Sequence, residues 1–455
     1  MGTSISATPD WPAGDGGEGL LELTVSDVAH GGWCVARQPG GRVVFVRHAL
    51  PGERVRARIT GTTARFARAD AVEILQASPD RVEPPCPHAR PDGCGGCDWQ
   101  HATLDAQRRL KAVVVRQQLR RIAGLDRQIT VEPLPGDSGG LGWRTRIRFS
   151  VGPDGAAGLL KHRSHQVVDV GACPLAHPLV HQTGVTGRRW ERVSSLEVAV
   201  SPGSGERAVM VTPAAERRQV ADGGSPAGRA ATMLSGLADT VLATGRGGRL
   251  TALRGPGYLR QHASGRAWRV GAGTFWQVHP GAADALTAAV LEALRPARGD
   301  VALDLFCGAG LFAGVLAEAV GPDGSVIGVE SDRSAVRDAR HNLRGLPWVR
   351  IHHGDAATLL AEGTVLSGGG RDGPEIAVLD PPRAGVGRAV IERLLGPART
   401  GGRLRRVAYV SCDPATLARD IAIFGELGWR LEGLRAFDAF PMTHHVECVA
   451  ALAPG

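Results

Sequence analysis

The segment VSCDPATLARD, residues 410–420, places Cys412 at the end of an apolar run and directly before Asp-Pro and a helix-like stretch. A thiolate at a strand end beside a helix start can be stabilised by backbone amides and can act as a nucleophile. A cysteine in such a run can equally be a small buried core residue. Cys412 is therefore a candidate nucleophile, and the motifs around it must decide between the two interpretations.

Residues 304–314, DLFCGAGLFAG, form a predicted strand that runs into a glycine-rich turn and a helix. Gly308 and Gly310 would let the backbone approach a ligand closely. Glu330, at the end of the next predicted strand, is placed to bind two ribose hydroxyls. Asp355, in HHGDA, could accept a hydrogen bond from an adenine amino group or could simply cap the next helix. The pattern indicates an adenosine cofactor, and S-adenosylmethionine fits it better than a dinucleotide.

Four of the eight cysteines form a third candidate centre. Cys86, Cys94 and Cys97 have the spacing Cys-x7-Cys-x2-Cys, and Cys173 lies further along in ACPL. Four thiolates fit either a tetrahedral zinc ion or an iron–sulfur cluster. The remaining cysteines at 34, 307 and 448 are predicted to be small buried residues.

The elements that must position these residues fall into several parts. A chain of 455 residues is expected to form about three domains. Residues 1–18 are predicted to be a disordered tail, and residues 19–79 contain five short strand-like runs, which is typical of a closed barrel of the oligonucleotide-binding kind. Residues 80–275 indicate an α+β central domain with a helix over 104–124. Residues 276–455 alternate strands with helices, which predicts a mainly parallel, doubly wound α/β sheet with ligands at the carboxyl ends of its strands.

The formal net charge of +8 favours polyanionic partners such as nucleic acid. Arginines crowd the predicted barrel, where one face could follow a phosphate backbone: Arg42, Arg47, Arg54, Arg56, Arg58, Arg65 and Arg68. The sequence has neither the pattern of a secretory signal nor a run of about 18 apolar residues. We therefore expect a cytoplasmic protein with no membrane partner.

Together these motifs resemble the RNA uracil-5 methyltransferase family, whose members modify uridine in ribosomal or transfer RNA. The resemblance rests on TFWQVHP (274–280), DLFCGAG, GVE, LDPPRAG (379–385), YVSCDPATLARD and MTHHVE (442–447). It spans essentially the whole chain, because the predicted barrel looks like the TRAM module that many members carry. It implies an N-terminal OB-like TRAM barrel, an α+β central domain with an iron–sulfur site, and a C-terminal Rossmann-like class I methyltransferase domain.

Uracil carbon 5 is too weak a nucleophile to take a methyl group directly from a sulfonium, so the ring must first be activated by a covalent nucleophile. The resemblance implies that Cys412 adds to carbon 6 of the uracil and that Glu447 later removes the proton from carbon 5. His444 and His445 are alternative bases. It further implies that Arg383 meets phosphate. The cofactor site implied by the motifs and the resemblance comprises Gln277, Phe306, Gly308, Gly310, Glu330, Asp355 and Asp380.

For the four cysteines the resemblance favours a [4Fe–4S] cluster of structural role, while the longer first gap leaves zinc as the alternative. We expect an enzyme that forms 5-methyluridine in 23S ribosomal RNA, since a barrel with a cluster is the commoner architecture of the ribosomal branch. A transfer RNA enzyme is the alternative. Two other classes are a nicotinamide oxidoreductase, which DPPR and SCDP argue against, and an inactive RNA-binding protein, which Cys412 and Glu447 argue against. The sequence leaves the oligomeric state open, with a monomer favoured.

Overall fold

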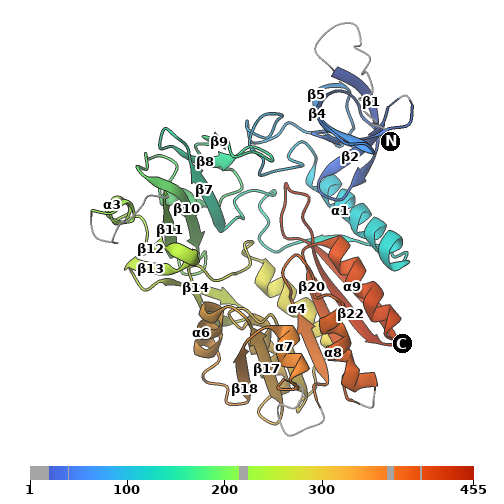
Figure 1. Ribbon diagram of the computed structural model, residues 1–455, viewed down its shortest axis with the longest axis vertical. Helices are drawn as coiled ribbons and strands as arrows, with labels where there is room; N and C mark the ends of the chain where they lie inside the picture. The colour runs from blue at the N-terminus through green and yellow to red at the C-terminus, as the bar shows by residue number, and fades with distance from the viewer. Residues whose placement is uncertain (1–19, 39, 215–223, 366–372, 400–401) are drawn as a thin grey trace, which may run out of the picture.

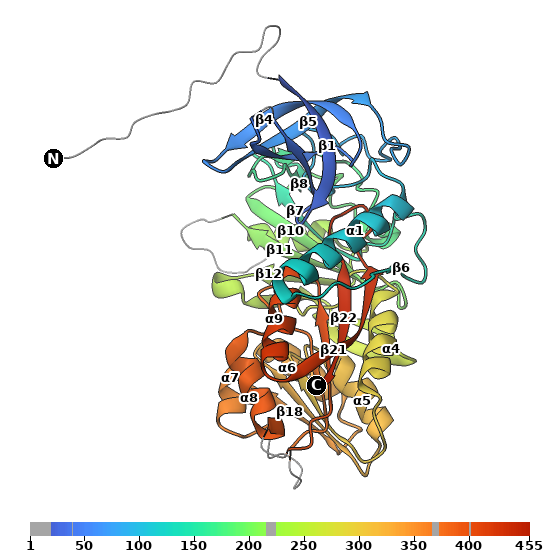
Figure 2. The same cartoon turned by 90° about the vertical axis from the view of Figure 1, so that its right-hand side faces the viewer.

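The computed structural model describes residues 20–38, 40–214, 224–365, 373–399 and 402–455, so the predicted tail at 1–18 lies outside the described part of the chain. Figure 2 shows a small barrel at one end of the long axis and a large sheet with helices on both faces at the other, with a second sheet between them. Cys412, Glu447 and most of the candidate cofactor residues lie at the large sheet. The barrel and the second sheet both lie above the large sheet in Figure 1.

The N-terminal body is a closed five-stranded barrel in the order β1-β2-β3-β5-β4. Its strands alternate buried and exposed side chains, and the inward residues form a compact apolar core that includes Leu23, Val44 and Val55. The strands are β1 Leu20–Ala29, β2 Trp33–Arg37, β3 Val43–Arg47, β4 Arg54–Thr62 and β5 Phe66–Gln76. The predicted barrel and its five strands are confirmed.

The central body is a seven-stranded sheet in the order β13-β12-β11-β10-β7-β8-β9. Its strands are β7 Arg146–Val151, β8 Ala157–Leu160, β9 Val167–Val168, β10 Val193–Val200, β11 Arg207–Pro213, β12 Thr240–Thr244 and β13 Leu250–Arg254. The accompanying short helices are α2 Pro178–Gln182, α3 Pro226–Met233 and the 3-10 turn η2 Arg246–Gly248. A separate hairpin, β14 Tyr258–Ala263 and β15 Arg266–Gly271, leads from this sheet to the C-terminal body.

The C-terminal body is an eight-stranded sheet in the order β18-β17-β16-β19-β20-β22-β21-β6. The first five strands in this order are parallel, and β22 runs antiparallel to both of its neighbours. The strands are β6 Val131–Pro133, β16 Val301–Leu305, β17 Ser325–Glu330, β18 Val349–His353, β19 Ile376–Leu379, β20 Arg406–Ser411, β21 Trp429–Asp438 and β22 Glu447–Pro454. The mainly parallel α/β sheet is therefore as predicted.

Two apolar layers cover this sheet, one on each face. One layer packs α7 Ala356–Ala361, α8 Arg388–Arg399 and α9 Pro414–Glu426 against the strands. The other contains residues of α4 Ala282–Leu294 and α5 Leu311–Val320, and α6 Arg333–Asn342 lies beside the β14–β15 hairpin (Figure 1). No helix in the described ranges has the length and apolarity needed to cross a bilayer.

A segment from the middle of the chain is built into the C-terminal body. Helix α1, Leu104–Gln118, continues into the π-helical turn η1, Leu119–Ala123, and confirms the helix predicted over 104–124. Val115 and Leu119 pack in the same core as residues of α9, and strand β6, Val131–Pro133, pairs in parallel with the end of β21. This segment therefore fixes the central body to the sheet that carries the candidate site.

Lys111 of α1 is expected to matter for stability because it forms an ion pair with Asp438 in which both side chains are fully buried. Its ammonium also donates to the carbonyl oxygen of Phe440 at 3.0 Å. Removing one partner of such a pair leaves an unpaired buried charge, so Lys111→Met should lower the free energy of unfolding by about 3–5 kcal/mol. Urea denaturation followed by near-ultraviolet circular dichroism would measure this.

The matched control is Arg109→Met on the same helix, because Arg109 pairs with Asp80 at 2.7 Å in a half-exposed position. Exposed pairs contribute about 0–1 kcal/mol, so this variant should unfold within about 1 kcal/mol of the parent. An equal loss in both variants would contradict the importance of burial for the Lys111 pair.

Candidate active site

The candidate residues gather along one edge of the C-terminal sheet. The parallel strands end at this edge, and β22 begins there because it runs the opposite way. In sheet order the edge carries Asp355 after β18, Glu330 at the end of β17, Phe306 after β16, Asp380 after β19, Cys412 after β20 and Glu447 at the start of β22. The nucleotide motifs thus occupy one half of the edge, and the nucleophile and base candidates occupy the other.

The glycine-rich turn after β16 has the backbone shape expected of a ligand-binding loop. Phe306, Gly308 and Gly310 have φ values of 69°, 54° and 93°. Gly310 begins α5 in this left-handed conformation, which costs glycine little. The Glu330 carboxylate accepts hydrogen bonds from the backbone N–H of Gly308 at 3.0 Å and of Asp332 at 2.7 Å. Glu330 therefore ties the glycine-rich turn to the end of β17.

Cys412 and Glu447 lie on neighbouring strands. Ser411 is paired with Cys448 across β20 and β22, and the antiparallel register brings the next residue of one strand beside the preceding residue of the other. Cys412 is half-buried, and Glu447 is 4% exposed. The structure thus brings the two residues of the predicted covalent mechanism together.

Burial raises the pKa values of the acidic side chains around the candidate nucleophile. It raises the pKa of the Cys412 thiol to about 11, with a smaller contribution from the charge of Glu447, while Arg383 lowers it by its charge and a hydrogen bond. Burial and the charge of Asp380 raise the pKa of Glu447 well above its usual value. Burial also raises the pKa of Asp380 to about 7. A carboxylate with a raised pKa is a stronger base, which suits Glu447 to proton abstraction.

Arg383 lies beside the nucleophile candidate. Its Nη2 is 3.1 Å from Nε2 of His445, and its side chain hydrogen-bonds Cys412. His445 is buried enough that its pKa falls to about 3, with further contributions from the charges of His444 and Arg383. His445 is therefore neutral at ordinary pH, and Arg383 is the cation nearest to the thiol that the geometry provides.

Relatives and family models agree with this arrangement. An uncharacterized RNA methyltransferase of Streptomyces avermitilis is 47% identical over 445 residues, covering 95% of this chain and 98% of that protein. Another from Streptomyces coelicolor is also 47% identical, with 95% and 92% covered. The family model described as tRNA (Uracil-5-)-methyltransferase matches residues 374–453, which include both Cys412 and Glu447. The chain belongs to the RNA uracil-5 methyltransferase family. The predicted family is thereby confirmed.

Two further family models match other parts of this methyltransferase, and a solved structure matches most of its length. A TRAM domain model matches residues 20–72, and a methyltransferase domain model matches residues 296–364. The solved structure of Pyrococcus abyssi tRNA (uracil-54, C5)-methyltransferase in complex with S-adenosyl-L-homocysteine has a TM-score of 0.69. It is 21% identical, and the match covers 95% of this chain and 99% of that one. The two proteins therefore share a fold across their whole length.

Glu330→Ala is expected to weaken cofactor binding by the methyltransferase. The variant loses the charged acceptor that holds the Gly308 N–H and, with it, the carboxylate that the sequence predicts to bind the ribose. A hydrogen bond to a charged group is worth about 1.5–3 kcal/mol, so the Kd for S-adenosylhomocysteine should rise about 10- to 100-fold. Isothermal titration calorimetry measures it. Asp332→Ala, which removes only the N-cap of α6, is the control and should change the Kd less than about 3-fold.

The raised pKa of Cys412 predicts a steep pH dependence for its reactivity. The thiolate is the reactive form, so between pH 7 and 9 its alkylation by iodoacetamide should accelerate about tenfold per pH unit, because both values lie below a pKa of about 11. Arg383→Met should slow alkylation at each pH, since it removes the cation that favours the thiolate. Mass spectrometry of the Cys412 peptide measures the rate, with the exposed Arg393→Met of α8 as the control. A rate that is flat with pH would contradict the assignment.

Two predicted cofactor residues have other partners in the structure. The Asp355 carboxylate accepts a hydrogen bond from the N–H of Thr358 at 3.0 Å and caps α7, which is the alternative raised from the sequence. Gln277 is buried in a small hollow with Thr145 and Val200, where the central sheet meets the segment leading into α4. Their contact with a cofactor stays a prediction.

Several positioning residues escaped the sequence analysis. The Asp98 carboxylate accepts a hydrogen bond from the N–H of His444 at 3.1 Å and pairs with its Nδ1 at 2.7 Å. His30 of the barrel contacts the Asp413 carboxylate at 3.4 Å, beside Cys412. Asp98 and His30 lie hundreds of residues from these partners in sequence, and no spacing pattern signals such contacts. Together they hold the loops before Glu447 and after Cys412.

A further buried carboxylate anchors the LDPPRAG loop. Asp420 of α9 is fully buried and accepts hydrogen bonds from the Tyr409 hydroxyl at 2.7 Å and the Val386 N–H at 2.8 Å. Asp304 is also fully buried, and burial raises its pKa well above the usual value. Both residues lie inside motifs quoted for the family resemblance, so their motifs were a usable signal for them.

The four predicted metal-ligating cysteines, Cys86, Cys94, Cys97 and Cys173, line one small cavity together with Gln100 and Arg144. The Gln100 amide accepts a hydrogen bond from the Cys86 N–H and donates to the Cys97 sulfur, both at 3.0 Å. Across the described residues, no group of three or more His, Cys, Asp or Glu side chains is arranged to hold a single metal ion. The other cysteines, Cys34, Cys307 and Cys448, are buried as predicted.

Proposed function

We propose that this methyltransferase forms 5-methyluridine in RNA through a covalent adduct between Cys412 and carbon 6 of the target uracil. The observation that carries the proposal is the placement of Cys412 and Glu447 on neighbouring strands, at the sheet edge that also carries the glycine-rich turn. A nucleophile, a base and a nucleotide-binding loop along one edge are the groups that this reaction needs.

In the proposed reaction, the Cys412 thiolate forms a bond to carbon 6 and opens the carbon 5–carbon 6 double bond, which leaves an enolate. S-adenosylmethionine would supply the methyl group that carbon 5 takes up, and its S–CH3 bond would break so that S-adenosylhomocysteine leaves with the electron pair. Glu447 then removes the proton from carbon 5. The electron pair of that C–H bond restores the double bond and expels the Cys412 thiolate. Glu447 then releases the proton to solvent, which returns the enzyme to its starting state.

The residues on the other half of the edge fit S-adenosylmethionine. A Cβ built on Gly308 meets no atom within 4 Å, so the turn leaves open space beside its backbone. The Glu330 carboxylate would bind the ribose hydroxyls, and Asp355, Phe306 and Gln277 would contact the remainder of the nucleoside. Asp380, between the two halves, would face both the cofactor and the uracil edge.

For the four cysteines we propose a [4Fe–4S] cluster that holds the central body together, with zinc as the alternative. The support is that all four cysteines line one cavity, and four thiolates are the ligands that either centre uses. Four thiolates would close the coordination, which fits a structural role. Iron and acid-labile sulfide analysis of protein purified without oxygen separates the two: about four irons per chain supports the cluster, and stoichiometric zinc overturns it.

We propose 23S ribosomal RNA as the substrate, with transfer RNA as the alternative. The support is the joint presence of the TRAM barrel and the four-cysteine cavity, which is the commoner architecture of the ribosomal branch. Incubating the enzyme with methyl-labelled cofactor and fractionated RNA from cells lacking the gene tests both the reaction and the choice of RNA. Label at uridine carbon 5 in the large ribosomal RNA supports the whole proposal, label in transfer RNA overturns the substrate, and no label in uridine overturns the reaction.

A further inference from the structure

A row of alternating aromatic and arginine side chains crosses the seam between the barrel and the central body. Arg68 of β5 lies 4.9 Å from the ring centroid of Phe66 and 6.0 Å from that of Trp33. Arg163, from the turn between β8 and β9, lies 5.6 Å from the same Trp33 ring, and Phe45 meets Phe66 edge-on at 5.3 Å. We call these five residues the seam strip.

The arginines of the seam strip differ from the ion-paired arginines of β4 in their charge environment. Within the described residues, no carboxylate lies within salt-bridge distance of Arg68 or Arg163, and Arg163 is exposed. By contrast, Arg54 and Arg56 on β4 pair with Glu22 at 2.9 Å and Glu73 at 2.8 Å. The seam strip therefore offers positive charge that the protein itself does not neutralise.

Buried polar atoms without partners lie beside the strip. Arg47 is 5% exposed, and its Nη2 has no hydrogen-bond partner among the described residues. The Nε2 atoms of His48 and His162 are also buried without a partner in this part of the chain, and the His162 ring meets Trp33 edge-on at 5.8 Å. Buried polar groups are normally paired, so these atoms leave hydrogen-bonding capacity that a bound ligand would complete.

The strip leads toward the active site. The turn at Gly32, next to Trp33, packs so closely on Asp98 that an added Cβ would lie 2.9 Å from the Asp98 carboxyl carbon. Asp98 in turn holds His444, and His30 of the same barrel turn reaches Asp413 beside Cys412. A chain bound along the seam strip would therefore run to the loops that carry the catalytic cysteine and glutamate.

We propose that the seam strip binds the unpaired nucleotides that flank the target uridine. Arg68 and Arg163 would contact successive phosphates, and the Phe66 and Phe45 rings would stack with bases. Arginine and aromatic planes in alternation suit splayed single-stranded bases, whereas a regular duplex presents only phosphates and sugars to such a surface. The inference rests on the proposed RNA substrate and adds the path by which that RNA reaches Cys412.

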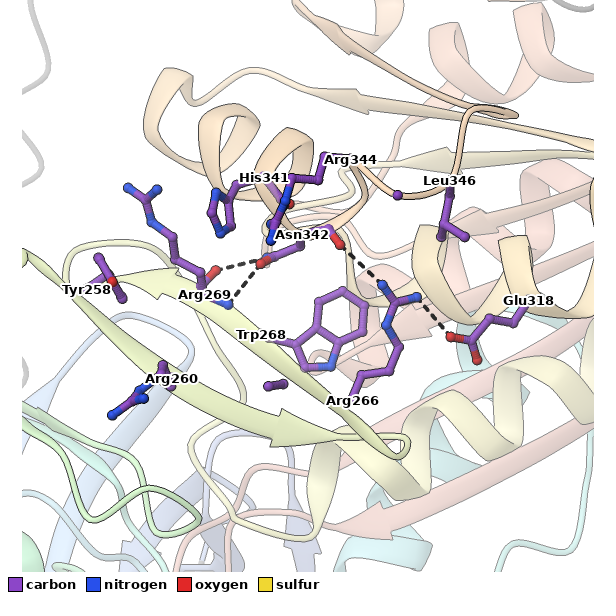
Figure 3. Close-up of a pocket in the computed structure, with 12 residues that line it drawn as sticks. Tyr258, Arg260, Arg266, Trp268, Arg269, Glu318, His341, Asn342, Arg344 and Leu346 are labelled. Atoms are coloured by element: carbon purple, nitrogen blue, oxygen red, sulfur yellow. Dashed lines mark hydrogen bonds and ion pairs between the residues drawn. The ribbon is translucent and has the colours of Figure 1, made fainter.

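A second arginine-rich surface differs from the seam strip in the ion pairing of its arginines. A hollow of about 590 Å³ lies between the β14–β15 hairpin and α6 (Figure 3). Three of its four arginines already face carboxylates: Arg260 meets Glu206 at 2.7 Å, Arg266 meets Glu318 at 2.9 Å and Arg269 meets Asp338 at 3.6 Å. This hollow is largely neutralised and serves as an internal comparison.

The test measures binding of a fluorescent 12-nucleotide oligouridylate to the full-length enzyme by anisotropy over a range of salt concentrations. The double variant Arg68→Ala, Arg163→Ala should bind at least about 10-fold more weakly at low salt. Its slope of log K against log salt should fall by about 1.4, because each phosphate contact on a single strand contributes about 0.7. Phe66→Ala should weaken binding without changing the slope, and Phe66→Trp should preserve it.

Two double variants are the matched controls: Arg54→Ala, Arg56→Ala on the barrel, and Arg260→Ala, Arg266→Ala in the hollow. Each should bind the oligonucleotide within about 2-fold of the parent, since these arginines are ion-paired. The seam variants must keep the parent's affinity for S-adenosylhomocysteine, which shows that they are folded. The proposal would be overturned if the seam double variant bound RNA as tightly as the parent. It would also be overturned if the control variants lost as much RNA affinity as the seam variant.

A perfect RNA duplex of the same length that competes as well as the single strand would also overturn it. Binding is measured without methyl transfer, so the outcome is separate from that of the proposed reaction. If the seam variants behave as expected but no uridine is methylated, the proposed function fails and the RNA path stands. If methylation occurs and the seam variants bind normally, only the path is wrong.

Discussion

Replacing Cys412 with alanine is expected to abolish methyl transfer to uridine, with a loss of at least about 10⁴-fold in kcat/KM, as for other nucleophiles of covalent catalysis. Without the sulfur, no nucleophile adds to carbon 6 and no enolate forms. Carbon 5 then stays too weak a nucleophile to take the methyl group. Binding of S-adenosylhomocysteine should be unchanged, because the glycine-rich turn and Glu330 lie on other strands. Transfer of labelled methyl to RNA measures the effect.

Cys34→Ala is the control for loss of a cysteine as such. Cys34 is fully buried in the barrel, and its sulfur donates to the carbonyl oxygen of Ala49 at 3.1 Å, far along the chain from the sheet edge. This variant should keep methyl transfer within a few-fold of the parent. Uridine methylation by Cys412→Ala at a rate near that of Cys34→Ala would rule out the covalent route.

Glu447→Gln is expected to trap the reaction after methyl transfer. The amide cannot take the proton from carbon 5, so the Cys412 adduct cannot be eliminated, and turnover should fall about 10²- to 10⁴-fold. A protein–RNA complex that survives denaturing electrophoresis should accumulate, and its appearance should depend on S-adenosylmethionine. Because Glu447 is buried, its uncharged isostere should fit the same space, so a structural collapse is not expected.

Two further variants are the controls for formation of the protein–RNA adduct. The double variant Cys412→Ala, Glu447→Gln should form no resistant complex, whereas Glu426→Gln at the exposed end of α9 should turn over normally without accumulating one. Parent-like turnover by Glu447→Gln would show that another group removes the proton. His445 is a poor substitute, because burial and neighbouring charges keep it neutral and its pKa at about 3.

The local elements of this protein were predictable because their signals lie within short windows of sequence. Short strand-like runs separated by glycine and proline turns identified the five barrel strands, and apolar strands separated by helices identified the parallel sheet. Since parallel strands carry their ligand-binding residues at one edge, the motifs after β16, β17, β19 and β20 were expected to meet there, and they do.

The contacts that complete the site were not predictable in the same way. Lys111 and Asp438 lie 327 residues apart, and Asp98 and His444 lie 346 apart. The pairing of β6 with β21 likewise joins the segment after α1 to the last part of the chain. Such partners are chosen by the packing of whole bodies, and one sequence carries no periodicity that relates them.

The sequence by itself predicted the barrel, the parallel sheet and the glycine-rich turn, and the family resemblance singled out Cys412 and Glu447 as the candidate nucleophile and base. Only the tertiary structure decided that Cys412 lies near both Glu447 and Arg383, and that Asp355 caps a helix. It also decided that His30 of the barrel and Asp98 of the cysteine segment hold the loops after Cys412 and before Glu447. The physical reason is that backbone periodicity is a local property, whereas burial, pKa shifts and ion pairs depend on which surfaces meet.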